Sequence, residues 1–135
     1  MLAVLDPNVL ISALLSPAGR AADVVRAWQR GEFDLVVSAL LLEELARALA
    51  YPKLRRRISE EDAHVFVHWI AGSATLVDDP DEDHPVRSSD SGDDYLIGLA
   101  ASVRAILVSG DRHLLELSDD IPVESPARFL HRLAQ

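Results

Sequence analysis

Residues 93–111, DDYLIGLAASVRAILVSGD, predict a helix followed by a buried strand. The helix carries apolar residues at i, i+3, i+4 and i+7, which is the spacing of a helix that packs on a sheet. Its leading acids, Asp93 and Asp94, lie where the helix dipole favours negative charge. The strand is expected at Ala105–Val108, and a short turn then leads to Asp111. Both ends of such a unit are places where an open parallel sheet presents ligand-binding groups.

Strand and helix patterns alternate along the rest of the chain. Short continuous apolar runs are typical of strands buried on both faces of a parallel sheet, and they occur at 2–5, 35–37, 74–77 and near Val123. Helices are expected over about 7–15, 21–29, 39–50, 60–71, 113–117 and 127–133. This alternation implies right-handed crossovers, so the predicted fold class is α/β, a three-layer α/β/α sandwich with a central, mostly parallel sheet.

Helix ends carry recognisable signals. Ser38, Ser59 and Ser125 each precede a helical segment and are predicted N-caps. Tyr51-Pro52 is expected to stop one helix and Gly72 to end the next. The polar, acidic segment 78–92 is expected to be a loop.

Length and composition favour a single soluble domain over residues 1–135. The chain has no apolar run of the roughly 18 residues that a membrane helix needs. The N-terminal MLAVLD has no basic region and reaches an acid at position 6, so it does not resemble a signal peptide. The absence of cysteine excludes disulfides and zinc–sulfur sites and is compatible with a cytoplasmic location.

The net charge of −9 disfavours diffuse binding to nucleic acid, which normally needs a basic surface. An acidic protein can still handle a polyphosphate if divalent cations neutralise the site and local arginines hold the backbone. The charge is uneven: residues 78–94 carry eight acids and one base, Arg87, whereas residues 53–57 read KLRRR.

Four acids occupy equivalent places in the predicted fold. Asp6 ends the first strand, Glu44 lies about two turns into the helix after the second, Asp94 begins the helix of the 93–111 unit, and Asp111 ends that unit. Like charges about 4 Å apart repel by roughly 4 kcal/mol at an effective dielectric of about 20. Such acids must therefore share protons or bind a cation, and carboxylates without His or Cys select Mg²⁺ or Mn²⁺.

Each acid also has a purely structural interpretation. Asp93 or Asp94 can act as a helix N-cap, Glu44 as a solvated helix residue, and Asp111 as a turn-former beside a glycine. Asp6 is harder to explain in this way, because burying an unpaired carboxylate at the end of a central strand costs several kcal/mol. The interpretation of these acids as a metal site therefore rests on their joint placement at one edge of the sheet.

Four segments in this order resemble PIN-domain ribonucleases, the toxin components of VapC-type (type II) toxin–antitoxin pairs: VLDPNVLIS (4–12), SALLLEEL (38–45), DDYLIGLA (93–100) and ILVSGD (106–111). The resemblance spans nearly the whole chain. It implies Mg²⁺- or Mn²⁺-dependent cleavage of single-stranded or structured RNA, an antitoxin partner and a homodimer. By this resemblance, the catalytic and metal-binding residues are Asp6, Glu44, Asp94 and Asp111, and the residues that support them are Asn8, Ser109 and Asp93.

Two features depart from the family pattern or leave it ambiguous. The family usually has a hydroxyl residue where this chain has Pro7, which removes one supporting hydrogen bond near the metal. Glu43 adjoins Glu44, and Asp93 adjoins Asp94. Glu44 is preferred because it precedes a leucine, and Asp94 because of its spacing to the following isoleucine and alanine. The alternative to an enzyme is a catalytically weak or inactive PIN-like module that binds RNA or protein.

Basic residues offer candidate RNA contacts. These are Lys53, Arg55, Arg56 and Arg112, although a solvated helix end explains the first three equally well. His64 and His68 have the i, i+4 spacing of metal ligands but lack the intervening glutamate of a zincin motif, so they are interpreted as surface residues.

Two other protein classes that gather acids at strand ends are disfavoured, because this chain lacks residues that they need. A response-regulator receiver needs an acidic pair after the first strand, and a haloacid-dehalogenase-type phosphatase needs a second Asp where this chain has Asn8. Both also need a lysine late in the chain, whereas the only lysine here is Lys53.

Overall fold

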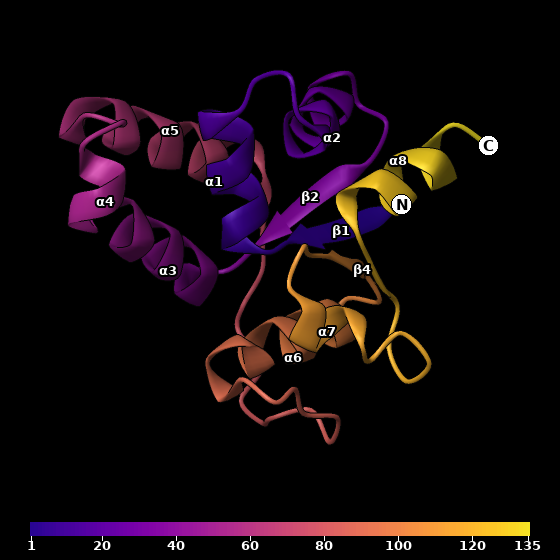
Figure 1. The fold of residues 1–135 in the computed structure, drawn as a ribbon. Coiled ribbons are helices and arrows are strands. Elements are labelled where there is room, and N and C mark those ends of the chain that lie inside the picture. Colours follow the sequence, from indigo (N-terminus) through magenta and orange to yellow (C-terminus); the bar gives the residue numbers. More distant parts are fainter.

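The computed structural model describes residues 1–135 and contains one five-stranded parallel sheet (Figure 1). The strand order across the sheet is β3-β2-β1-β4-β5. Every neighbouring pair is parallel, with Ala3 opposite Leu35 and Leu5 opposite Val108 around the central strand. The strands are β1 Leu2–Leu5, β2 Asp34–Val37, β3 Thr75–Leu76, β4 Ile106–Val108 and β5 Val123–Glu124.

Helices cover both faces of the sheet, so the predicted three-layer sandwich is confirmed (Figure 1). One layer contains α1 Pro7–Leu15, α2 Arg20–Gln29, α3 Ala39–Leu49, α4 Pro52–Arg55, α5 Glu60–Ser73 and α8 Pro126–Leu133. The other contains α6 Asp94–Ser102 and α7 Arg112–Leu115, preceded by a short 3₁₀ turn, Ser91–Asp93. A membrane-spanning helix is not found among them, since none is both long and apolar enough.

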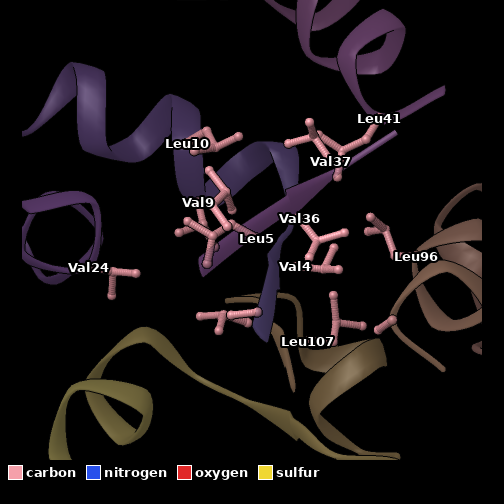
Figure 2. Close-up of a cluster of buried hydrophobic side chains, with 14 of the residues drawn as sticks. Val4, Leu5, Val9, Leu10, Val24, Val36, Val37, Leu41, Leu96 and Leu107 are labelled. Carbon is pink, nitrogen blue, oxygen red and sulfur yellow. The ribbon is translucent and has the colours of Figure 1, made fainter. Parts of the chain in front are cut away.

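The core lies on both sides of β1 because successive side chains of a strand point to opposite faces. Val4 lies toward α6 with Leu96, whereas Leu5 lies toward α1 with Val9 (Figure 2). All four side chains are buried. Burial on both faces explains why the strands are continuous apolar runs rather than alternating patterns.

Replacing Leu107 of β4 by Ala is expected to lower the free energy of unfolding by about 2–5 kcal/mol, because Leu107 is 1% exposed and its loss leaves a cavity. The matched exchange Leu76→Ala removes the same atoms from a residue that is 62% exposed, and we expect a change within about 0.5 kcal/mol. Urea denaturation of both variants measures the difference. Equal losses in the two variants would contradict this description of the core.

All three predicted serine N-caps are confirmed. The hydroxyl oxygens accept hydrogen bonds from backbone N–H groups three residues on, Ser38 from Leu41 at 3.2 Å, Ser59 from Asp62 at 3.0 Å and Ser125 from Arg128 at 3.2 Å. Each bond satisfies a donor that the first helical turn would otherwise leave unpaired. The caps of Ser38 and Ser125 fix where α3 and α8 leave the sheet, and the cap of Ser59 fixes where α5 begins after α4.

One of two predicted helix ends is confirmed and the other is wrong. α3 ends before Tyr51-Pro52, as predicted, and Pro52 also begins α4, because proline fits the first position of a new helix, where no N–H is needed. Gly72 does not end α5, which continues to Ser73. Gly72 lacks the left-handed backbone of a terminating glycine, whereas Gly31, just after α2, has that backbone with a φ of 77°.

Candidate active site

Asp6 and Asp111 lie together at the carboxyl edge of the sheet because β1 and β4 are parallel neighbours. Asp6 directly follows β1, and Asp111 is the N-cap of α7, where its Oδ1 accepts a hydrogen bond from the His113 N–H at 2.8 Å. The buried Ser109 hydroxyl connects them. It donates to Asp6 Oδ2 at 2.8 Å and accepts from the Asp111 N–H at 3.0 Å. A single side chain thus sets the relative positions of the two acids.

Asp6 is the most deeply buried acid of this edge, with 2% exposure. Burial raises the pKa of its carboxyl group, and the nearby charge of Asp111 raises that pKa further. Hydrogen bonds from the Asn8 N–H, at 3.0 Å, and from Ser109 act in the opposite direction because they favour the ionised form. A buried carboxylate held in this way is stabilised when a cation binds beside it.

Asp93 and Asp90 complete an acidic group around Asp111. One carboxylate oxygen from each of the three residues lies within 4.8 Å of the others. Burial, and then a hydrogen bond to Asp111, raise the pKa of Asp93 to about 7, with further contributions from the charges of Asp6 and Asp90. The same hydrogen bond lowers the pKa of Asp111. The Asp93–Asp111 pair therefore shares a proton near neutral pH, which is one of the two outcomes expected for crowded carboxylates.

Asp94 contacts a different part of the chain. Its Oδ1 accepts a hydrogen bond from the Ser88 N–H at 2.8 Å, and its Oδ2 lies 3.5 Å from Arg87 Nη1. Asp93 thus occupies the place in the acidic group that the sequence analysis gave to Asp94. Asp94 instead connects the 78–90 loop to the start of α6.

Glu44 lies on α3, forms an ion pair with Arg47, and is partly exposed. Tyr95 connects Glu44 electrostatically with the acids at the carboxyl edge of the sheet. Its pKa is raised first by burial and then by the charges of Asp6, Glu44, Asp93 and Asp79. Tyr95 is therefore within electrostatic reach of Glu44 and of the acids at the sheet edge.

Asp79 is an acid at this edge that the sequence analysis did not identify. Its Oδ2 accepts a hydrogen bond from the Leu40 N–H at the start of α3, at 3.0 Å. Its Oδ1 is buried without a hydrogen-bond partner. The signal was present in the sequence, because Asp79 closely follows a strand, as Asp6 and Asp111 do, but it was hidden among the many acids of the 78–92 loop.

The donor set fits a hard divalent cation. Asp90, Asp93 and Asp111 offer only carboxylate oxygens, and neither histidine nor cysteine belongs to the group. Each carboxylate has about four lone-pair positions, so the hydrogen bonds to Asp6 and Asp111 leave sites for coordination. Oxygen ligands of this type select Mg²⁺, Mn²⁺ or Ca²⁺ over softer metals.

The basic residues that are candidates for RNA contact lie in two places, one far from the acidic group and one next to it. Lys53, Arg55 and Arg56 lie on or next to α4, at the far end of α3 from the sheet edge, and the 11 residues of α3 span roughly 16 Å. Arg112 adjoins Asp111, and its side chain is 83% exposed. The RNA contacts of all four residues stay predictions.

Comparisons with known proteins identify the family and the fold of this chain. A family model described as PIN domain matches residues 3–113, which include Asp6, Asp93 and Asp111. The uncharacterized protein MJ1680 of Methanocaldococcus jannaschii is 27% identical over 117 residues, which cover 87% of this chain and 75% of the relative.

Three solved structures share the fold. PAE2754 from Pyrobaculum aerophilum has a TM-score of 0.68 at 20% identity and covers 98% of this chain and 88% of its own. VapBC2 from Rickettsia felis, bound to a DNA fragment from its promoter, has a TM-score of 0.66 at 12% identity, covering 93% and 98%. FitAcB from Neisseria gonorrhoeae has a TM-score of 0.59 at 20% identity, with the same two coverages.

Proposed function

We propose that this chain, which belongs to the PIN domain family, is a divalent-metal-dependent endoribonuclease and the toxin of a VapC-type toxin–antitoxin pair. The observation that carries the proposal is the group of Asp90, Asp93 and Asp111, whose oxygens lie within 4.8 Å of one another. Asp6 is connected to this group through Ser109. Acids held so closely by the fold favour a bound cation over mutual repulsion.

The roles of the individual residues follow from their contacts. Asp90, Asp93 and Asp111 would hold the metal, because their oxygens lie close together, and Asp6 would join them as the acid that Ser109 connects to Asp111. Ser109 and the backbone of Asn8 orient Asp6, and Asp94 positions the start of α6 through Ser88. Glu44 lies on α3, where it pairs with Arg47, and its charge acts on Tyr95; it would complete the site from the side of α3.

A bound Mg²⁺ or Mn²⁺ supplies a nucleophilic water at neutral pH and neutralises the charge of the phosphodiester. The protein's own contribution is to position these charges and to hold a proton. Asp93 and Asp111 would give up the proton that they share in order to hold the cation, since ligating carboxylates must be ionised. The net charge of −9 makes a cation necessary for approach of the RNA backbone, and Arg112, which adjoins Asp111 in the chain, is a candidate phosphate contact.

The second candidate function is a PIN-like module that binds RNA or a protein without cutting. Pro7, buried at the first position of α1, favours this alternative because it offers no hydroxyl beside Asp6. The retained acidic group favours the enzyme. The two functions differ in their dependence on metal.

A fluorescently labelled single-stranded RNA is expected to be cleaved in the presence of Mg²⁺ or Mn²⁺ and to remain intact with EDTA. The physical reason is that the acids alone repel the phosphodiester and offer no activated water. Readdition of the metal in excess of the chelator should restore cleavage, which controls for damage by EDTA. Binding of the RNA without cleavage under all conditions would favour the non-catalytic module.

We also propose a partner protein, an antitoxin, and a homodimer. The likeness in fold to VapBC2 and FitAcB supports the partner. Trp28 of α2 and Trp69 of α5 pack with ring centroids 5.2 Å apart beside cavities of about 390 and 410 Å³. The first cavity is lined by the two tryptophans with Gln29 and Ser73, and the second mainly by apolar residues of α1 and α5. Together they offer a surface for an amphipathic partner helix. The proposed place of action is the cytoplasm.

A further inference from the structure

A cavity of about 350 Å³ opens beside the acidic group, on the side of α1, α2 and α8. We call it the Ser12 cavity. It is lined by Asn8, Val9, Ser12, Ala21, Gly110, Asp111 and Pro126. Asp111 belongs both to this lining and to the acidic group, so a ligand in the cavity lies next to the proposed metal site. Its volume is at the lower end of small-molecule sites.

Two hydrogen-bonding side chains of the cavity are free to contact a ligand. Asn8 and Ser12 are four residues apart on α1, so they lie on the same face of the helix. Asp6 uses the backbone N–H of Asn8, but neither the Asn8 amide group nor the Ser12 hydroxyl has a side-chain hydrogen bond within the protein. Both residues are exposed. The cavity therefore offers donors and acceptors that the fold itself does not use.

The rest of the lining determines the charge of the ligand. Val9, Ala21 and Pro126 are apolar, and no lysine or arginine lines the cavity. The one charged group is Asp111, which would repel a phosphate. A flat, uncharged group with a hydrogen-bonding edge matches this lining better than a phosphate does, and a nucleobase is such a group. Without an aromatic side chain for stacking, discrimination between bases would rest on hydrogen bonds to Asn8 and Ser12.

We propose that the Ser12 cavity binds one unpaired nucleobase of the RNA, next to the phosphodiester that is cleaved, and that Asn8 and Ser12 determine which base is accepted. This inference rests on the proposed ribonuclease function and adds a specificity site to it. Asparagine can form two hydrogen bonds to one base edge, and a pair of this kind discriminates between bases by a factor of about ten to a hundred.

Binding can be tested without catalysis by NMR titration of the protein with AMP, CMP, GMP and UMP in separate experiments. We expect saturable shifts of the Asn8 side-chain amide and of the Ser12 and Ala21 backbone amides, with one nucleotide binding at least about tenfold tighter than the weakest. In the variant Ser12→Leu these shifts should disappear, because the larger side chain fills the cavity. Leucine is a good helix former and Ser12 is exposed, so the variant should fold. Shifts that are unchanged in Ser12→Leu, or equal for all four nucleotides, overturn the proposal.

The cleavage positions in a random-sequence RNA pool give the second test. The wild-type protein should cut beside a preferred base, and Ser12→Leu and Ala21→Leu should each lose that preference and raise KM by about tenfold or more. Ala101→Leu is the matched control, because Ala101 is exposed on α6, outside the cavity. Wild-type cleavage with an unaltered base preference in both cavity variants overturns the nucleobase site and leaves the ribonuclease intact. Base-selective NMR shifts in a protein that cuts no RNA would instead overturn the proposed enzyme and leave the nucleobase site.

Discussion

Asp6→Asn is expected to lower the rate of RNA cleavage by more than about a hundredfold while the fold survives. Loss of a residue that only orients a metal ligand typically costs 10–100-fold, and loss of a ligand itself should exceed that range. The amide has the shape of the carboxylate but carries no charge. It therefore removes the negative group that lies next to Asp111 at the centre of the edge.

The stability of this variant separates a chemical effect from unfolding. Because burial raises the pKa of Asp6, the ionised carboxylate is disfavoured in the fold, and a neutral amide should be tolerated. The amide oxygen can accept from the Asn8 N–H, and the amide N–H₂ can donate to Ser109. The melting temperature of the metal-free variant should equal or exceed that of the wild-type protein at pH 8.

Asp34→Asn is the matched control, since Asp34 is exposed and begins β2 at the opposite edge of the sheet. Cleavage by this variant should equal that of the wild-type protein in the same fluorescence assay. A wild-type rate in Asp6→Asn would remove Asp6 from the site and with it the proposed metal chemistry.

The second large effect is expected at Asp93. Asp93→Asn should lower cleavage by more than about a hundredfold, because Asp93 shares its proton with Asp111 and lies in the acidic group. Asp94→Asn should have a smaller effect, about tenfold, because Asp94 acts through Ser88 and Arg87. Comparing the cleavage rates of these two Asp→Asn variants thus shows which of the two acids is the metal ligand. A greater loss in Asp94→Asn than in Asp93→Asn would restore the assignment made from the sequence motif.

The pH dependence of stability gives Asp93 a second, independent readout. Its pKa is about 7 in the folded protein and 3.8 in the unfolded chain, so its stabilising contribution is complete below about pH 4 and is lost as the pH rises through 7. Asp6 acts in the same direction, and Asp111, whose pKa is lowered, acts in the opposite one. Thermal denaturation in EDTA should therefore show a falling melting temperature between pH 5 and pH 8.

Two comparisons test this interpretation of the pH dependence. Asp93→Asn should flatten the decline, because the amide does not titrate, whereas Asp94→Asn should retain it. Mn²⁺ should raise the melting temperature more at pH 8 than at pH 5, since the ligands must lose their shared proton to bind it. A melting temperature of the metal-free wild-type protein that rises from pH 5 to pH 8 would contradict the shared proton.

Much of the fold follows from local sequence. The apolar runs at 2–5 and 35–37 become β1 and β2, and Ser38, Ser59 and Ser125 cap the expected helices. These features depend on side-chain alternation, apolar burial and hydrogen bonds over three residues, all of which a sequence displays directly. The helix end predicted at Gly72 was wrong, because glycine ends a helix only where its backbone turns left-handed, and Gly72 stays inside α5.

The sequence also places Asp6 and Asp111 at one edge, since the ends of parallel strands share it, and the pairing of β1 with β4 then brings the two acids together. The choice between Asp93 and Asp94 does not follow from the sequence. Asp93 ends the 3₁₀ turn and Asp94 begins α6, so the geometry of this junction decides which acid lies beside Asp111. The contact of Asp79 with the start of α3 and the Ser12 cavity could likewise be found only in the tertiary structure, because each brings together segments that are distant in the chain. The sequence determined the sheet and the edge at which its acids gather, and long-range packing decided which of them meet.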